Sequence, residues 1–178
     1  MHQDIERVSY SEETIAQRVA ELGVRVSADY RDRDPILLGI LKGSFIFLAD
    51  LARTLHIPCE IQFMKASSYG SGTSSSGTVN LTPGLTVEVS GRHVLIVEDI
   101  LDSGRTLELL TAHLETLGAA SVEICVLLDK IERREVPIAA KYIGFTCPSE
   151  FYVGYGLDYA ERYRHLPYIG VLKPEIYS

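Results

Sequence analysis

Cysteine is scarce in this sequence, with Cys59, Cys125 and Cys147 among 178 residues and no CxxC pair. An odd number of widely spaced cysteines does not indicate a disulfide framework, so we expect a reducing compartment. Cys59 and Cys125 fall inside apolar stretches and are expected to act as small core residues. The N-terminal stretch MHQDIERV has no features of a signal peptide, and a cytoplasmic location is therefore expected.

Long apolar runs and basic clusters are also missing. No apolar stretch approaches the roughly 20 residues that a membrane-spanning helix needs. Lys and Arg number 17 against 24 Asp and Glu, which gives a net charge of −7. The longest basic cluster, Arg133 and Arg134, is flanked by Glu132 and Glu135. We therefore expect neither membrane nor nucleic-acid binding, although backbone N–H groups and a metal ion could still hold a small anionic substrate.

The chain has no internal repeat and no linker, and residues 1–178 are expected to form a single domain. Ser11 is a plausible N-cap of a first helix that Gly23 would end, and Ser44 could cap a second helix. Strands and helices then alternate, which predicts an α/β fold with a doubly wound, mostly parallel sheet. The expected helices span 11–22, 44–55 and 104–117, and the expected strands 36–41, 57–65, 93–98, 122–128, 142–145, 151–155 and 168–172.

A loop of small polar residues, SSYGSGTSSSG, covers 67–77. Nothing in it can be buried for stability, so we expect a flexible loop. It could be a disordered hairpin tip or an active-site lid, and Tyr69 within it favours the lid.

The stretch Val94–Leu107, VLIVEDILDSGRTL, contains the most informative motif. An apolar strand ends in Glu98 and Asp99, and the residues Ser103, Gly104, Arg105 and Thr106 follow at the start of a helix. The helix N-terminus, a glycine and two hydroxyls make a cradle for a phosphate. Adjacent carboxylates at a strand end can accept bonds from a pair of hydroxyls or hold Mg²⁺. The simpler alternative, a capped helix start beside a solvated turn, does not explain the whole arrangement.

This stretch resembles the motif with which type I phosphoribosyltransferases bind phosphoribosyl pyrophosphate (PRPP). The resemblance implies that Glu98 and Asp99 meet the ribose hydroxyls, directly or through Mg²⁺. It implies that the segment from Ser103 to Thr106 cradles the 5-phosphate. It also implies that Asp102 lies beside N7 of a purine as the general base.

Other segments resemble the same family. Leu41-Lys42-Gly43-Ser44 resembles its pyrophosphate loop, which has a non-proline cis peptide before the lysine. Arg164 matches an arginine that contacts pyrophosphate, and Ser68-Tyr69 matches the Ser-Tyr of the flexible lid.

The hypoxanthine–guanine branch of the family is indicated by residues toward the C-terminus. The resemblance implies that Lys130 contacts the exocyclic oxygen of the purine, that Phe151 stacks on the base and that Asp158 reaches a second Mg²⁺. The resemblance also implies a small hood, mainly 145–178 with a contribution from the N-terminus. Tyr152 departs from the pattern, because a small aliphatic residue is more common where the backbone contacts the base.

The resemblance therefore implies purine salvage, in which PRPP and hypoxanthine or guanine are converted to a nucleoside monophosphate and pyrophosphate with Mg²⁺ as cofactor. A homodimer or homotetramer is expected. The alternatives are a xanthine-preferring relative and a regulator that senses nucleotides on the same fold, although such a regulator needs a basic surface that this sequence lacks.

Overall fold

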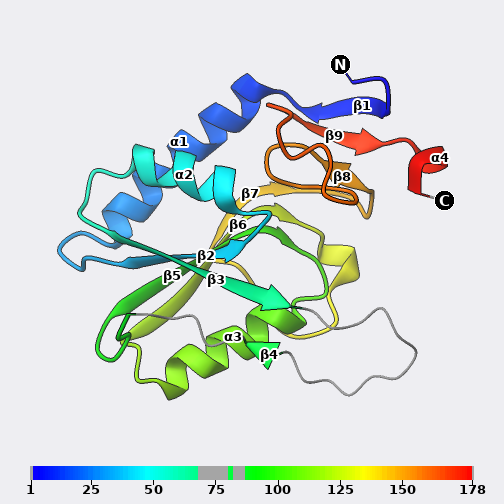
Figure 1. The fold of residues 1–178 in the computed structure, drawn as a ribbon. Helices are drawn as coiled ribbons and strands as arrows, with labels where there is room; N and C mark the ends of the chain where they lie inside the picture. The colour runs from blue at the N-terminus through cyan, green and yellow to red at the C-terminus, as the bar shows by residue number, and fades with distance from the viewer. Residues whose placement is uncertain (1, 68–79, 82–86, 178) are drawn as a thin grey trace.

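A six-stranded sheet forms the body of the protein (Figure 1). The computed structural model describes residues 2–67, 80–81 and 87–177. The strand order is β4-β3-β2-β5-β6-β7, and all neighbouring pairs are parallel except β3 and β4. The strands are β2 (Ile36–Leu41), β3 (Glu60–Ser67), β4 (Asn80–Leu81), β5 (His93–Leu101), β6 (Ser121–Asp129) and β7 (Tyr142–Thr146).

Helices cover both faces of this sheet, as Figure 1 shows. Helices α1 (Glu12–Asp29) and α2 (Phe45–Thr54) pack on one face, and α3 (Arg105–Thr116) packs on the other. The strand β2 is buried on both sides because its alternate residues enter two different cores. Leu37 joins the core under α1 and α2, whereas Leu38 joins the core under α3. The predicted doubly wound α/β fold is confirmed.

The two ends of the chain build a smaller antiparallel sheet beside the body. It contains β1 (Ile5–Tyr10), β9 (Ile169–Leu172) and β8 (Tyr152–Val153), in that order, and is followed by α4 (Pro174–Tyr177). Ile5 pairs with Leu172. Figure 1 shows both termini at this corner of the molecule, and we call this unit the hood. A hood built mainly from 145–178 with a contribution from the N-terminus was predicted, but the strand β1 and its pairing with β9 were not.

The prediction that Gly23 ends the first helix is wrong. Helix α1 continues to Asp29, and Gly23 is buried within it. A Cβ atom at this position would lie 2.0 Å from Oγ1 of Thr54 on α2. Gly23 is therefore a contact residue that lets the backbone of α1 approach α2 closely.

Ser44 is the N-cap residue of α2, as predicted, and its carbonyl accepts a hydrogen bond from the N–H of Leu48 at 2.8 Å. Ser44 precedes the helix, but its hydroxyl donates to the carbonyl of Ile40 at 2.6 Å and makes no capping bond. The expected strand 57–65 begins only at Glu60. Within it, Ile61 and Phe63 remain 45% and 42% exposed, so this apolar face is left partly uncovered.

Across the three described ranges, no helix is both long and apolar enough to span a bilayer.

Candidate active site

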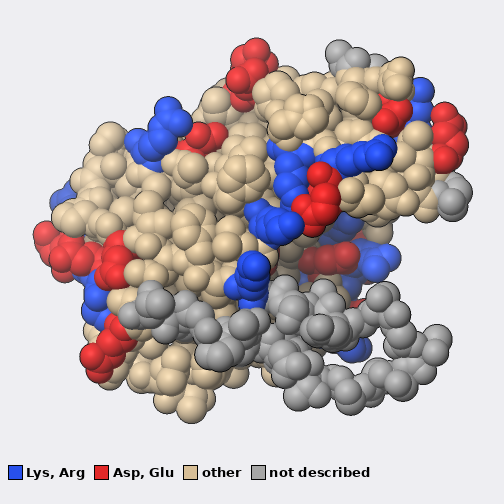
Figure 2. All heavy atoms as spheres, in the orientation of Figure 1, with Lys and Arg blue, Asp and Glu red and all other residues tan. Residues whose placement is uncertain are grey.

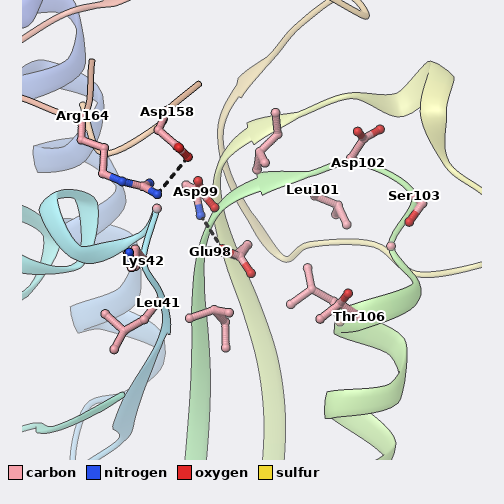
Figure 3. Close-up of a pocket in the computed structure, with 15 residues that line it drawn as sticks. Leu41, Lys42, Glu98, Asp99, Leu101, Asp102, Ser103, Thr106, Asp158 and Arg164 are labelled. Atoms are coloured by element: carbon pink, nitrogen blue, oxygen red, sulfur yellow. Dashed lines mark hydrogen bonds and ion pairs between the residues drawn. The ribbon is translucent and has the colours of Figure 1, made fainter. Parts of the chain in front are cut away.

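A cavity of about 290 Å³ opens where the carboxyl ends of β2 and β5 meet the start of α3 (Figure 3). This is the edge of an open α/β sheet at which ligands usually bind. It brings together residues that the sequence analysis assigned to one site from four separate segments. The predicted residues that line it are Lys42, Gly43, Glu98, Asp99, Asp102, Ser103, Gly104, Thr106, Asp158 and Arg164.

Two adjacent carboxylates, Glu98 and Asp99, form one wall. They lie within β5, which continues to Leu101, so the strand does not end at them as expected. The N–H of Asp99 donates to Oε1 of Glu98 at 3.1 Å. Burial raises the pKa of Glu98 well above its ordinary value, and the neighbouring charge of Asp99 raises it further. A cation or a pair of hydroxyls bound here would offset this cost of a buried negative charge.

The cradle at the start of α3 has the backbone shape that its sequence requires. Gly104 lies just before the helix with a φ of +85°, a conformation that glycine adopts without strain. A Cβ atom at this position would lie 2.5 Å from Cγ2 of Ile138. Ser103 and Thr106 face the cavity beside the helix N-terminus, where an anion is stabilised. The side chain of Arg105 instead turns away to an ion pair with Glu135, with 2.6 Å between Nε and Oε2.

The loop after β2 is pressed against the carboxylate wall. The Leu41–Lys42 peptide bond is cis, as the resemblance predicted. A Cβ atom on Gly43 would lie only 1.8 Å from Oδ2 of Asp99, and one on Gly156 would lie 2.1 Å from the carbonyl oxygen of Gly43. Glycine at 43 and 156 therefore allows the loop to fit between the carboxylates and the hood.

Two cationic side chains reach this loop, and both are paired with carboxylates. Nζ of Lys42 lies 3.0 Å from Oε2 of Glu161. Nη2 of Arg164 lies 2.9 Å from Oδ1 of Asp158, and its Nη1 donates to the carbonyl of Gly156 at 2.8 Å. In the view of Figure 2, basic side chains (blue) gather in the middle of the molecule with acidic ones (red) among them. A polyanionic ligand could replace these acidic partners.

Asp102 is held by a segment that the sequence analysis did not assign to the site. Its Oδ1 lies 3.0 Å from Nε of Arg133, which belongs to the short 3₁₀ helix η1 (Ile131–Arg133). The neighbouring Arg134 donates from Nε to the carbonyl of Asp102 at 3.2 Å and also bonds the buried carboxylate of Asp129. Arg134 thus ties the end of β5 to the end of β6. The sequence analysis noted these two arginines only as a basic cluster, although their place just after Lys130 was a usable signal.

The predicted base-binding residues lie outside the cavity lining. The N–H of Lys130 donates to the carbonyl of Leu101 at 3.0 Å, next to Asp102. The ring of Phe151 stacks on Tyr177 with centroids 4.7 Å apart. Tyr152 is buried beneath the ammonium group of Lys130. The ammonium group of Lys130, from the end of β6, and the ring of Tyr152, from the hood, are thus brought together. Ser68 and Tyr69, the predicted lid residues, lie outside the described residues.

The predicted metal ligands do not close into a cage. Glu98, Asp99 and Asp158 all line the cavity, but within the described part of the chain no three acidic, histidine or cysteine side chains form a group that could hold a metal ion. Mg²⁺ usually takes only one or two carboxylates and completes its shell with water and phosphate oxygens. The carboxylate pair at 98 and 99 fits such a partial ligand set.

Comparison with known proteins finds similar proteins along the whole chain. Residues 9–160 match the phosphoribosyl transferase domain family. The hypoxanthine-guanine phosphoribosyltransferase of Streptococcus pneumoniae is 50% identical over all 178 residues and 99% of its own length. A bifunctional TilS/HprT protein of Listeria innocua is 52% identical, and the chain spans 28% of that protein. A crystal structure of a hypoxanthine phosphoribosyltransferase from Staphylococcus aureus has a TM-score of 0.95 and 47% identity, and the match covers 100% of this chain and 97% of that one.

Proposed function

Because this chain belongs to the phosphoribosyltransferase family, we propose that it transfers ribose 5-phosphate from PRPP to hypoxanthine or guanine and releases pyrophosphate. The observation that supports this most directly is the cavity itself. A substrate with a phosphate, a diol and a pyrophosphate would use the cradle, the carboxylate pair and the cationic loop together.

PRPP would span the cavity from α3 to the hood. The 5-phosphate accepts hydrogen bonds at the cradle of Ser103 to Thr106, where the helix dipole stabilises it. Glu98 and Asp99 accept hydrogen bonds from the ribose hydroxyls. The pyrophosphate displaces Glu161 from Lys42 and contacts Arg164. At Lys42 this exchanges an exposed ion pair of small energy for charge-assisted bonds to phosphate.

Magnesium would bind beside the carboxylate pair and, for a second ion, near Asp158. When bound, it would neutralise charge that develops on the leaving pyrophosphate. The chain itself contributes the oxygen ligands of Glu98 and Asp99 and a loop in which the absence of a side chain at Gly43 keeps space next to Asp99.

The chemical step is a displacement at the anomeric carbon. N9 of the purine forms the new bond, the bond to the pyrophosphate oxygen breaks, and the proton on N7 passes to Asp102. The transition state has oxocarbenium character, as in other glycosyl transfers. Arg133 pairs with Asp102 in the absence of substrate and keeps its carboxylate at the rim of the cavity.

The base would lie between the cavity and the hood, with Phe151 against one face and the backbone at Tyr152 along its edge. Lys130 would donate to O6 of a 6-oxopurine. Adenine presents an amino donor at position 6, and an ammonium group has no acceptor for it. Ser68 and Tyr69 would close over the reacting centre and exclude water, which would otherwise hydrolyse PRPP.

A homo-oligomer is part of the proposal. Phe45, Ile61 and Phe63 remain 42%, 45% and 42% exposed on the α2 side of the sheet, and we call them the apolar patch. Exposed apolar side chains of this kind are typical of protein–protein contacts. The enzyme would work in the cytoplasm, in keeping with the free thiols of Cys59, Cys125 and Cys147.

The test is steady-state kinetics with PRPP, Mg²⁺ and a panel of hypoxanthine, guanine, xanthine and adenine. We expect the first two to react and adenine to be at least about tenfold poorer, because an unsatisfied buried charge costs more than about 1 kcal/mol. Lys130→Ala should lower kcat/KM for hypoxanthine and leave KM for PRPP unchanged.

Comparable use of adenine and hypoxanthine would contradict the base assignment, and a preference for xanthine would support the alternative of a xanthine-preferring relative. No turnover with any base, combined with tight PRPP binding, would favour a regulator.

A further inference from the structure

The side chain of Tyr152 contacts the residue proposed to select the base. Nζ of Lys130 lies over the Tyr152 ring, 5.6 Å from its centroid. This is within the distance at which a cation is attracted to the negative face of an aromatic ring. The ring is only 5% exposed, so the attraction is little weakened by water on that side.

Lys130 differs in this respect from the other cations of the site. Lys42 and Arg164 are each paired with a carboxylate. Among the residues that the structure describes, no carboxylate lies within ion-pair distance of Lys130. Its ammonium group lies over the aromatic ring, and Glu150 acts on it only through a longer-range Coulombic attraction. An ammonium group on a carboxylate shares its N–H donors and its charge, whereas one on a ring face keeps its three donors free for a ligand.

The ring is itself fixed from its far end. The hydroxyl of Tyr152 donates to Oε2 of Glu150 at 3.1 Å, and Glu150 pairs with Arg7 on β1. Hydrogen bonding from Arg7 lowers the pKa of Glu150, so this carboxylate stays ionised and remains an acceptor. The backbone of Tyr152 pairs with Val171 in the hood. The ring therefore has little freedom to move away from Lys130.

We propose that the Tyr152 side chain is a positioning residue that holds the Lys130 ammonium group for recognition of a 6-oxo group, and so sets part of the selectivity for the base. The inference rests on the proposed function, and it assigns to the phenol ring a role separate from the backbone contact to the base. A small aliphatic side chain at 152 would give Lys130 no ring face, and the ammonium group would lose rotamer freedom only when the base arrives.

The test compares binding of two nucleotides by calorimetry: inosine 5′-monophosphate (IMP), which has O6, and purine riboside 5′-monophosphate, which lacks it. The wild-type protein should prefer IMP. Tyr152→Leu should reduce this preference about tenfold, mainly through weaker IMP binding, whereas Tyr152→Phe should retain it because the ring remains. In Lys130→Ala the preference should already be lost, and adding Tyr152→Leu should reduce it no further.

Tyr30→Leu is a matched control, because Tyr30 is another buried tyrosine in the core that contains Tyr152, and its ring contacts His93 at the end of β5 away from the site. It should lower the melting temperature and leave the IMP preference unchanged. If Tyr152→Leu does not fold, Tyr152→Phe and Tyr152→trifluorophenylalanine give the same test, since fluorine weakens the negative ring face at nearly equal size. The variant with the fluorinated ring should then bind IMP less tightly than Tyr152→Phe does.

The possible outcomes distinguish a failure of the proposed function from a failure of the role proposed for Tyr152. If the wild-type protein forms no IMP from hypoxanthine and PRPP, the proposed function fails and this inference fails with it. If IMP forms and Lys130→Ala removes the preference, but Tyr152→Leu weakens both nucleotides equally, only the inference fails. A preference that survives Lys130→Ala, or independent effects of the two substitutions, would also overturn it.

Discussion

At the scale of single residues, the side chains of the site are held in place by hydrogen bonds and ion pairs from residues that do not line the cavity. Asp102 is fixed through its carboxylate by Arg133 and through its carbonyl by Arg134. Asp129 is 4% exposed and would be a costly unpaired charge without Arg134. The positions of Asp102, the proposed general base, and of Lys130, which is proposed to contact the purine, therefore depend on one short segment that contacts both strand ends.

Asp102→Asn tests the proposed proton transfer. The amide has nearly the same shape but cannot accept the N7 proton, so we expect kcat to fall about 10²–10⁴-fold. PRPP affinity, measured by calorimetry with Mg²⁺, should change little, because the cradle and the carboxylate pair are intact. Arg133→Gln is the control, since it removes the partner of Asp102 and keeps the carboxylate, and it should reduce kcat far less. A kcat near that of the wild type in Asp102→Asn would leave Asp102 with a structural role only.

At the scale of helices and strands, periodicity predicted most of the body and missed features that depend on contacts between distant segments. The strand 36–41 was predicted with its exact bounds, because a continuous apolar run can be buried only from both faces. Gly23 was misjudged, since a close approach to Thr54 cannot be seen from the local sequence. For the same reason the pairing of β1 with β9 was missed. The site motif was predicted in place, but the arginines that support it lie about 30 residues further along the chain.

Gly23→Ala should destabilise the protein although it favours a helix. Alanine gains about 0.8–1.0 kcal/mol in helix propensity. The new methyl group would overlap Thr54 on α2, and forced overpacking costs about 1–3 kcal/mol, so we expect a net loss of about 1 kcal/mol in urea unfolding. Thr54→Ala in the same background should recover part of this loss. Val24→Ala, at a position 62% exposed, should have almost no effect. Unchanged or higher stability in Gly23→Ala would show that α1 and α2 move apart at no cost.

At the scale of the whole molecule, the site lies at the boundary between two units. The body supplies the carboxylate pair and the cradle, and the hood supplies Arg164 and the proposed base-stacking ring of Phe151. The loop at Lys42 and Gly43 lies between them, close to the N-terminal end of α2. The apolar patch begins at Phe45, two residues after Gly43, so a subunit contact there would be close to the loop that is proposed to bind pyrophosphate.

Phe63→Lys tests whether the apolar patch is a subunit interface. A charge in the middle of a buried contact would be unpaired, so we expect the protein to shift toward monomer in sedimentation velocity at micromolar concentration. Leu117→Lys is the matched control, because Leu117 is 43% exposed at the end of α3, on the other side of the sheet. An identical sedimentation profile for both variants and the wild type would exclude the patch as the interface.

The pairing of β1 with β9 also has a consequence for synthesis. All strands of the body have been synthesised once Thr146 is added to the chain, whereas Ile5 must wait for Leu172. The first strand of the nascent chain is thus among the last to find its partner, and such long-range pairing is slow. On the proposed assignment, the cradle at Ser103 to Thr106 and the carboxylate pair belong to the body, so the part of the site proposed for ribose 5-phosphate needs no residue after Thr146. Phe151 and the backbone at Tyr152, which are proposed to contact the base, are fixed only after β9 has been made. A nascent chain that lacks β9 is therefore expected to bind ribose 5-phosphate before it can select a base.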